Sequence, residues 1–302
     1  RDLPLSIRRQ RQMCIRDSAG PAGLTGPTGD PGPRPAQVIW VATSGGDFTT
    51  IGAALASITD NSSTSRYLIK VAPGAYTETS TIVLKDFVDI EGSGQNVTTI
   101  TPTSEGPGLT AAGPLTSEVR HLTVDVGTGA DGIYTTNVVA GSVSFLHVTA
   151  IGDRGVVNSN SSPTMNNVTA SGINSGVMNF SSSPTMNSVT ATGEFAVYNE
   201  TSSPTMNNVI ANGSAAGVRN RTSSAPMMNG VTASGYYGMY NSSSSPTIRN
   251  SVITGSSFSI GNFSASTAKV ANCIRSGPLL GAGTFTGSYG NVTPDFVPVA
   301  NP

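Results

Sequence analysis

The sequence predicts an all-β protein, a right-handed parallel β-helix (a solenoid of stacked coils) with a short N-terminal capping helix. A phrase that reads SSPTMNNVTASG at residues 161–172 recurs with substitutions as far as residue 255. An asparagine that accompanies it recurs every 20 or 21 residues, from Asn158 to Asn262. Each repeat contains strand-length pieces between Gly-rich or Ser-rich turns, whereas a helix takes about 10–12 contiguous residues. Stacked coils, one for each repeat, are what this pattern favours.

Two segments precede the β-helix. Residues 1–18 lack the continuous apolar stretch of a secretion signal, and MCIRDS at their end resembles a translated sequencing adaptor. We interpret residues 1–18 as a non-native leader; a native basic leader is the alternative. In residues 19–35 glycine recurs every third residue from Gly20 to Gly32, which is the collagen period. This segment predicts a collagen-like stalk and therefore a homotrimer, the alternative being a flexible Gly/Pro linker.

The β-helix is predicted to occupy residues 36–272. It opens with a strand at residues 38–41, and short β-rich runs follow at residues 67–72, 81–84, 87–91 and 97–101. Between them, apolar residues recur at the spacing of one helix face: Ile51, Ala54, Leu55 and Ile58. Residues 273–302 break the repeat and are predicted to fold back as a C-terminal cap, in which Cys273 is a buried apolar thiol.

Equivalent residues of stacked coils lie above one another at the ~4.8 Å spacing of neighbouring strands. Three apolar columns are therefore predicted to form the core. The first contains Met165, Met186, Met206, Met228 and Ile248; the second contains Val168, Val189, Val209 and Val231; the third contains Val156, Val177, Val197, Val218, Met239 and Ile260. In the last copy Ser251 occupies the valine position of the second column, and we expect a local bulge there.

Two further repeated positions are polar or small. The recurrent asparagines are predicted to form a ladder of amide–amide hydrogen bonds between coils. They are Asn158, Asn179, Asn199, Asn220, Asn241 and Asn262. The glycines before the third column, such as Gly176, are predicted to adopt a positive φ or to allow two backbones to approach closely.

Three motifs in residues 47–101 follow the predicted helix: Ile69-Lys70-Val71, then Gly74-Ala75-Tyr76-Thr77-Glu78, then Ile90-Glu91-Gly92-Ser93-Gly94. Together they resemble the N-terminal coils of the pectin lyase-like superfamily, especially of pectinesterases. The resemblance implies the β-helix fold, and it implies that Glu78 either supports a substrate region or belongs to the turn between two coils. The catalytic motifs of pectinesterases further along the chain are not found in this sequence. Gly-Pro triplets before such a β-helix also resemble bacterial and phage surface fibres.

Composition argues against an ordinary globular enzyme. Only 11% of the residues are charged, against roughly 25% in typical soluble domains, and the net charge is −1. Bulk electrostatics therefore attract neither nucleic acid nor anionic lipid, and no apolar run is long enough to span a membrane. Residues 155–262 contain no aspartate and only two glutamates, whereas polysaccharide hydrolysis needs paired carboxylates. No cofactor is expected.

The candidate acid–base residues lie before the regular repeats. Asp131 and Arg154 align one coil apart, with Asp125 and Asp153 near them. They form either an exposed ion pair or a catalytic patch. His121 and His147 share a column with Asn167, and we interpret them as polar replacements for asparagine rather than as metal ligands, since no third ligand is evident.

The candidate ligand-binding residues are Tyr198, Tyr236, Tyr237 and Tyr240, which are expected in turns around the third column together with Phe180 and Phe195. Such rings either stack on sugars, or cover coil edges or pack protomers in a trimer. The favoured hypothesis is an extracellular or cell-surface fibre module, structural or adhesive and non-catalytic, with a polysaccharide or glycan as its partner. A carbohydrate-active enzyme of the pectinesterase or lyase type, and a phage tail fibre or spike, are the alternatives.

Overall fold

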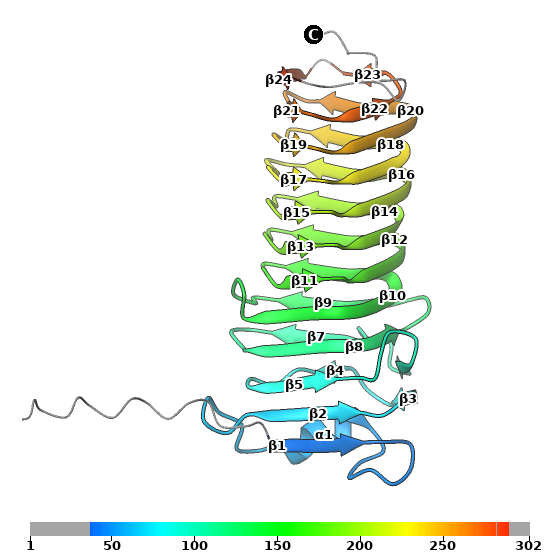
Figure 1. The fold of residues 1–302 in the computed structure, drawn as a ribbon, viewed down its shortest axis with the longest axis vertical. Coiled ribbons are helices and arrows are strands. Elements are labelled where there is room, and N and C mark those ends of the chain that lie inside the picture. Colours follow the sequence, from blue (N-terminus) through cyan, green and yellow to red (C-terminus); the bar gives the residue numbers. More distant parts are fainter. Residues whose placement is uncertain (1–36, 282, 290–302) are drawn as a thin grey trace, which may run out of the picture. The chain divides into compact units, whose positions relative to one another are not determined.

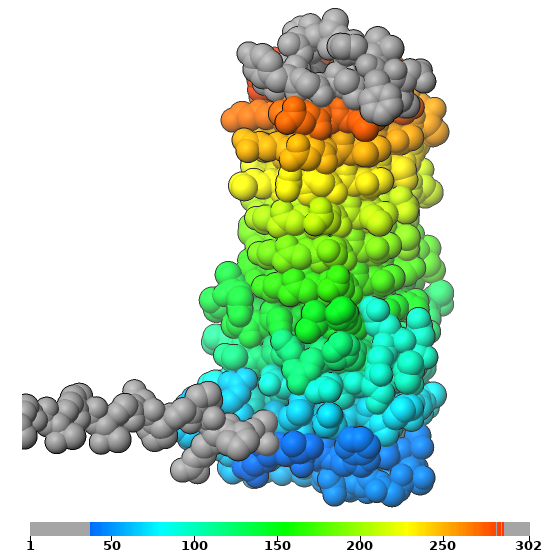
Figure 2. Space-filling view, in the orientation of Figure 1, coloured from blue at the N-terminus to red at the C-terminus, as the bar shows by residue number. Residues whose placement is uncertain are grey.

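The computed structural model describes residues 37–281 and 283–289, which form stacked coils of parallel β-strand (Figure 1). The coils follow one another in chain order from blue to red, and each covers the one before it (Figure 2). The predicted right-handed parallel β-helix is confirmed. The predicted leader (residues 1–18) and collagen-like stalk (residues 19–35) lie outside the described residues. In the part of the chain that is described, no helix is long and apolar enough to cross a membrane.

Each regular coil contributes one segment to each of three parallel sheets, named sheets A, B and C in chain order. Sheet A contains β1 (Gln37–Val41), β2 (Tyr67–Val71), β5 (Val88–Glu91), the first parts of β8 (Ser117–Asp125) and β10 (Val143–Ser159), β11 (Thr164–Asn166), β13 (Thr185–Asn187), β15 (Thr205–Asn207), β17 (Met227–Asn229), β19 (Thr247–Arg249), β21 (Thr267–Ala271) and β24 (Thr284–Tyr289). Sheet B contains β3 (Gly74–Glu78), β6 (Thr98–Pro102), later parts of β8 and β10, the first parts of β12 (Thr169–Phe180), β14 (Thr190–Glu200), β16 (Ile210–Arg221), β18 (Thr232–Ser242) and β20 (Val252–Phe263), and β22 (Ile274–Ser276). Sheet C contains β4 (Ile82–Val83), β7 (Leu109–Ala112), β9 (Asp131–Thr136), the last parts of β10, β12, β14, β16, β18 and β20, and β23 (Leu279–Leu280).

The predicted apolar columns are confirmed. Met165 pairs in register with Met186, and Val177 pairs with Val197, and all four side chains are fully buried. The methionine column continues toward the N-terminus through residues of other types, namely Phe145, Val119, Ile90 and Ile69. Identical positions therefore fill one hollow along the coils, as dispersion and apolar burial require.

The expected bulge at Ser251 is wrong. Arg249 pairs with Asn229 and Val252 pairs with Thr232, so both sides of the serine keep the same offset of 20 residues. The Ser251 side chain is buried in the valine column, where its hydroxyl donates to the carbonyl of Arg249 (2.6 Å) and accepts from the N–H of Val231 (3.1 Å). A buried hydroxyl with both hydrogen bonds made is tolerated in an apolar column, so no extra residue is needed.

The asparagine ladder is confirmed. Each amide nitrogen from Asn158 to Asn241 donates to the side-chain oxygen of the asparagine in the next coil, at 2.7–2.8 Å. The ladder begins at the hydroxyl of Thr135, which donates to Asn158, and ends at the carbonyl of Thr284, which accepts from Asn262. All six asparagines are fully buried, so the ladder satisfies polar groups that water cannot reach.

The corners of the coil use different residues. At Gly176 a Cβ atom would lie 2.7 Å from backbone atoms of neighbouring segments, which confirms the predicted close approach. The φ angle of Gly176 is not positive, so the predicted alternative of a positive φ is wrong. Positive φ occurs instead at the two other corners. Between sheets A and B it is 50–56° in His121, His147, Asn167, Asn208 and Asn250, and between sheets C and A it is 47–51° in Asn160, Ser181, Thr201, Thr222 and Ser243. Asparagine and histidine are enriched in this left-handed region among non-glycine residues.

The predicted helix is α1 (Ile51–Ser57), and its buried residues Ile51, Ala54 and Leu55 cover the first coil. Glu78 is buried beneath its first turn. The Glu78 carboxylate accepts hydrogen bonds from the N–H groups of Ile51 (2.6 Å) and Gly52 (3.1 Å). Burial raises the pKa of Glu78, while these two donors oppose the rise. Glu78 is therefore the anionic cap of α1, a role that the sequence did not indicate.

The expected C-terminal boundary does not coincide with the end of the described coils. Beyond residue 272, β22 and β23 pair in parallel with β20, and β24 pairs with β21. Cys273 is buried as predicted, and burial raises the pKa of its thiol.

Candidate functional site

Most of the predicted site residues lie along sheet C or at the corner before it, whereas Asp125 ends the sheet B part of β8. In-register pairing places one row at the start of the sheet C segments, running from Asp131 to Arg154 and on to Phe195 and Tyr237. A second row three residues later contains Met178, Tyr198, Arg219 and Tyr240. The acid–base residues thus occupy the N-terminal part of this face and the aromatic residues occupy the C-terminal part.

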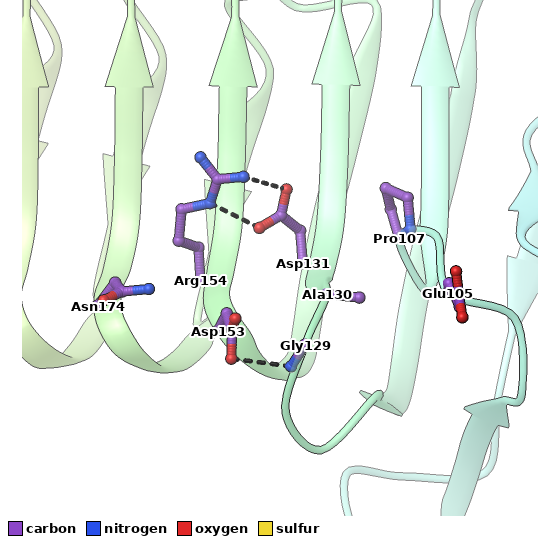
Figure 3. Close-up of a pocket in the computed structure, with 8 residues that line it drawn as sticks. All are labelled: Glu105, Pro107, Gly129, Ala130, Asp131, Asp153, Arg154 and Asn174. Atoms are coloured by element: carbon purple, nitrogen blue, oxygen red, sulfur yellow. Dashed lines mark hydrogen bonds and ion pairs between the residues drawn. The ribbon is translucent and has the colours of Figure 1, made fainter.

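The acid–base part is a groove of about 310 Å³ (Figure 3). Its lining residues are Glu105, Pro107, Gly129, Ala130, Asp131, Asp153, Arg154 and Asn174. Arg154 donates to Asp131 through two parallel hydrogen bonds, from Nε at 2.6 Å and from Nη2 at 2.9 Å. The Asp131 side chain is 8% exposed and that of Arg154 is 37% exposed, so the pair lies at the wall of the groove rather than in bulk water. A bidentate pair of this kind fixes both side chains.

The other carboxylates of this region are not gathered around that pair. Asp153 accepts a hydrogen bond from the N–H of Gly129 at 2.9 Å, as Figure 3 shows. Asp125 lies outside the groove lining and accepts from the N–H of Gly127 at 2.9 Å. Glu105 lines the groove but was not singled out from the sequence, because it lies in a coil without the repeat. The groove therefore holds three carboxylates. Asp131 and Asp153 have hydrogen-bond partners, whereas Glu105 has none among the described residues.

The four predicted tyrosines form one aromatic cluster, which we define as Phe195, Tyr198, Tyr236, Tyr237, Tyr240, Phe258 and Phe263. The ring centroids of Tyr237 lie 5.0 Å from Tyr236, 5.3 Å from Tyr240 and 5.4 Å from Phe258. Tyr236 is 47% exposed, so the cluster presents ring surface to solvent. Phe180, in the same sheet, is also exposed.

Arg219 lies within this aromatic cluster, and sequence reasoning did not select it. Its guanidinium carbon is 4.4 Å from the centroid of Phe195, 5.2 Å from Tyr198 and 5.4 Å from Tyr240. A detectable signal was present, because Arg219 is 21 residues from each of these tyrosines, one coil on either side. A hollow of about 230 Å³ is lined by Arg219, Ala215 and Ala216 together with four rings of the cluster, Phe195, Tyr236, Tyr237 and Tyr240.

Two tyrosines of the aromatic cluster, Tyr198 and Tyr237, have a raised pKa. The Tyr198 hydroxyl donates to Glu200 at 2.8 Å and accepts from Arg221 at 3.1 Å. Burial, followed by the bond to Glu200, raises the pKa of Tyr198. Burial likewise raises the pKa of Tyr237. The raised pKa values favour the protonated form of both hydroxyls.

The histidine column is confirmed. The rings of His121 and His147 are stacked, with centroids 5.1 Å apart and planes 13° from parallel, and the Asn167 amide lies 3.5 Å from His147 Nε2. Across residues 37–281 and 283–289, no group of three or more His, Cys, Asp or Glu side chains is arranged to hold a metal ion.

Three parallel sheets, inward columns and a helix over the first coil define a right-handed parallel β-helix, the fold that the N-terminal motifs implied. Similar solved structures include a pectin methylesterase from carrot (TM-score 0.50, 12% identity, 84% of this chain and 87% of that chain). The catalytic domain of a GH87 α-1,3-glucanase gives a TM-score of 0.54 at 14% identity, over 86% of this chain and 59% of that one. Tailspike protein 2 of Escherichia coli bacteriophage CAB120 gives 0.58 at 13% identity, over 85% of this chain and 41% of that one. At these identities the similarity shows the fold alone.

No protein-family profile matches the sequence, and no curated protein matches it.

Proposed function

We propose that this chain is the glycan-binding rod of an extracellular or surface-displayed fibre, and that it binds without catalysing a reaction. The aromatic cluster on sheet C is the observation that carries this proposal. Partly exposed tyrosine rings on a stiff, hydrogen-bonded sheet present large apolar faces with a polar edge, which is the surface that a sugar ring stacks on. Because the rings come from successive coils, a chain of sugars running along the coils contacts several of them.

The fibre part of the proposal rests on two features. The collagen-like period of residues 19–35 requires three chains, so a homotrimer is the expected assembly. One of the similar folds is a bacteriophage tailspike protein, so a phage tail fibre or spike is a variant of the same proposal. The genes that neighbour this one distinguish a surface fibre from a phage tail fibre or spike.

A glycan array probed with the full chain tests the binding function. We expect selective binding that is lost in Tyr236→Ala and Tyr237→Ala but kept in Trp40→Ala, whose exposed ring lies on sheet A. No binding by the wild-type chain, or equal loss in all three variants, would contradict the proposal. The light-scattering mass of the chain with and without residues 19–35 tests the trimer: a monomer in both cases excludes it.

A second candidate function is a carbohydrate-active enzyme working in the groove, as two of the similar folds are enzymes. Its supporting observation is the groove itself, which brings Glu105, Asp131 and Asp153 into one lining. Against it, Asp131 is bound by Arg154 and Asp153 by a backbone N–H, so neither is poised for proton transfer. Release of methanol, reducing ends or unsaturated sugars from a polysaccharide panel, lost in both Glu105→Gln and Asp131→Asn, would establish this function instead.

A further inference from the structure

The position of Arg219 suggests what kind of glycan the aromatic cluster recognises. Arg219 lies on β16, and three rings from the two neighbouring strands surround its guanidinium: Phe195 and Tyr198 of β14 and Tyr240 of β18. The guanidinium carbon lies 4.4–5.4 Å from their centroids, within the ~6 Å over which a cation is attracted to a ring face. Such contacts hold the guanidinium plane in place but use none of its N–H donors.

Two other arginines of the rod are neutralised by carboxylates. Arg120 is bound by Glu91 and Glu118, and Arg154 is bound by Asp131. For Arg219, by contrast, the described residues provide ring contacts but no hydrogen bond or ion pair. Arg219 is half-buried and lines the hollow of about 230 Å³, so its five donors have no acceptor among the described residues.

Neither of the two carboxylates near Arg219 forms an ion pair with it. Glu200 accepts a hydrogen bond from the Tyr198 hydroxyl. It pairs in register with Arg221, two residues further along the strand than Arg219. Glu194 is exposed at the corner before Phe195 and makes no ion pair with Arg219. A fixed, partly buried guanidinium without a protein anion is a site for an external one.

We propose that Arg219 makes the aromatic cluster selective for anionic sugars. The sugar ring stacks on Tyr236 and Tyr237, and its carboxylate, sulfate or phosphate accepts two hydrogen bonds from the guanidinium. The hollow is smaller than the roughly 300–1,000 Å³ of pockets for drug-sized ligands, so it takes one sugar of a longer chain. This inference rests on the proposed glycan-binding function and adds the ligand class to it.

Calorimetric titration of the full chain with three oligosaccharides of equal length tests the inference: an oligoglucuronate, its carboxyl-reduced counterpart and a sulfated glucan. We expect Arg219→Met to weaken the binding of an anionic oligosaccharide at least tenfold and to leave the carboxyl-reduced one unchanged. Arg219→Lys keeps the charge without the planar fork and should recover only part of the loss. Arg249→Met, which removes an exposed arginine from sheet A, is the matched control and should change nothing.

The outcomes separate the two proposals. If wild-type protein binds no glycan on the array and none of the three by calorimetry, the glycan-binding function itself fails; if it binds glycans on the array but neither anionic oligosaccharide, only the anion selectivity fails. If it binds the reduced oligosaccharide as tightly as the acidic ones, or if Arg219→Met weakens all three equally, glycan binding stands and the anion selectivity is wrong. Preference for the carboxylate or for the sulfate identifies the anionic group. Equal melting temperatures of variant and wild type exclude misfolding as the cause.

Discussion

Replacing Asn199 by alanine tests the structural logic of the rod. The Asn199 side chain is fully buried, accepts a hydrogen bond from Asn179 at 2.8 Å and donates one to Asn220 at 2.8 Å. The substitution removes both partners at once, leaving a buried donor on Asn179 and a buried acceptor on Asn220.

The expected loss follows from these two groups. A buried polar group left without its partner costs about 1–3 kcal/mol, so two cost about 2–6 kcal/mol of the free energy of unfolding. Asn207→Ala is the matched control, because Asn207 donates to Asn187 at 2.9 Å in an equivalent coil-to-coil bond but is only half-buried. Water can replace its bond, so we expect a loss of about 0–1 kcal/mol there.

Urea unfolding followed by far-UV circular dichroism measures both variants against wild type. The midpoint should fall clearly in Asn199→Ala and hardly in Asn207→Ala, with unchanged slopes. If both variants lose the same stability, the inner ladder contributes no more than a surface bond and the reasoning is refuted.

Three further substitutions test other features. Gly176→Ala places a Cβ atom 2.7 Å from backbone atoms and should destabilise the fold by about 1–3 kcal/mol in the same urea assay; an unchanged midpoint would show that the coils can separate at this corner. The hydrogen bond and charge of Arg120 hold the pKa of Glu91 below its ordinary value of 4.5. The ionised Glu91 therefore contributes its full stabilisation above pH 4.5, and this stabilisation is lost as pH falls through the lowered pKa. Glu91→Gln should therefore flatten the acid side of the stability–pH curve, and an identical curve would contradict this. Burial lowers the pKa of Arg275, which pairs in register with the fully buried Ile253, so Arg275→Met should raise the melting temperature; a lower one would show that the charge is well solvated.

The core could be predicted from the sequence where the repeats are near copies. Met165 and Met186 stand in identical phrases, so their stacking follows from the period alone. The same column could not be traced to Ile90 or Phe145, because the earlier coils keep apolar character and lose residue identity. Ser251 was misjudged because a polar residue in an apolar column suggested a shift of register, whereas local hydrogen bonds accommodate it.

The site was predictable to the extent that it obeys the same period. Asp131 and Arg154, and the tyrosines of the aromatic cluster, were found because residues one coil apart come into contact. Arg219 obeys the period too, but it was not selected, although it stands one coil from a tyrosine on either side. Glu105 lies in an irregular coil, where no spacing indicates which residues it meets.

The one-way run of amide bonds from Thr135 to Thr284 makes the coils interchangeable. Every inner asparagine receives from the preceding turn of the chain and gives to the following one, so deleting or duplicating a complete turn leaves each survivor fully bonded. Deleting only part of a turn leaves two asparagine amides without their hydrogen-bond partners. The molecule can therefore lengthen or shorten in increments of ~4.8 Å by whole-repeat duplication or loss, which changes its reach and leaves its chemistry intact.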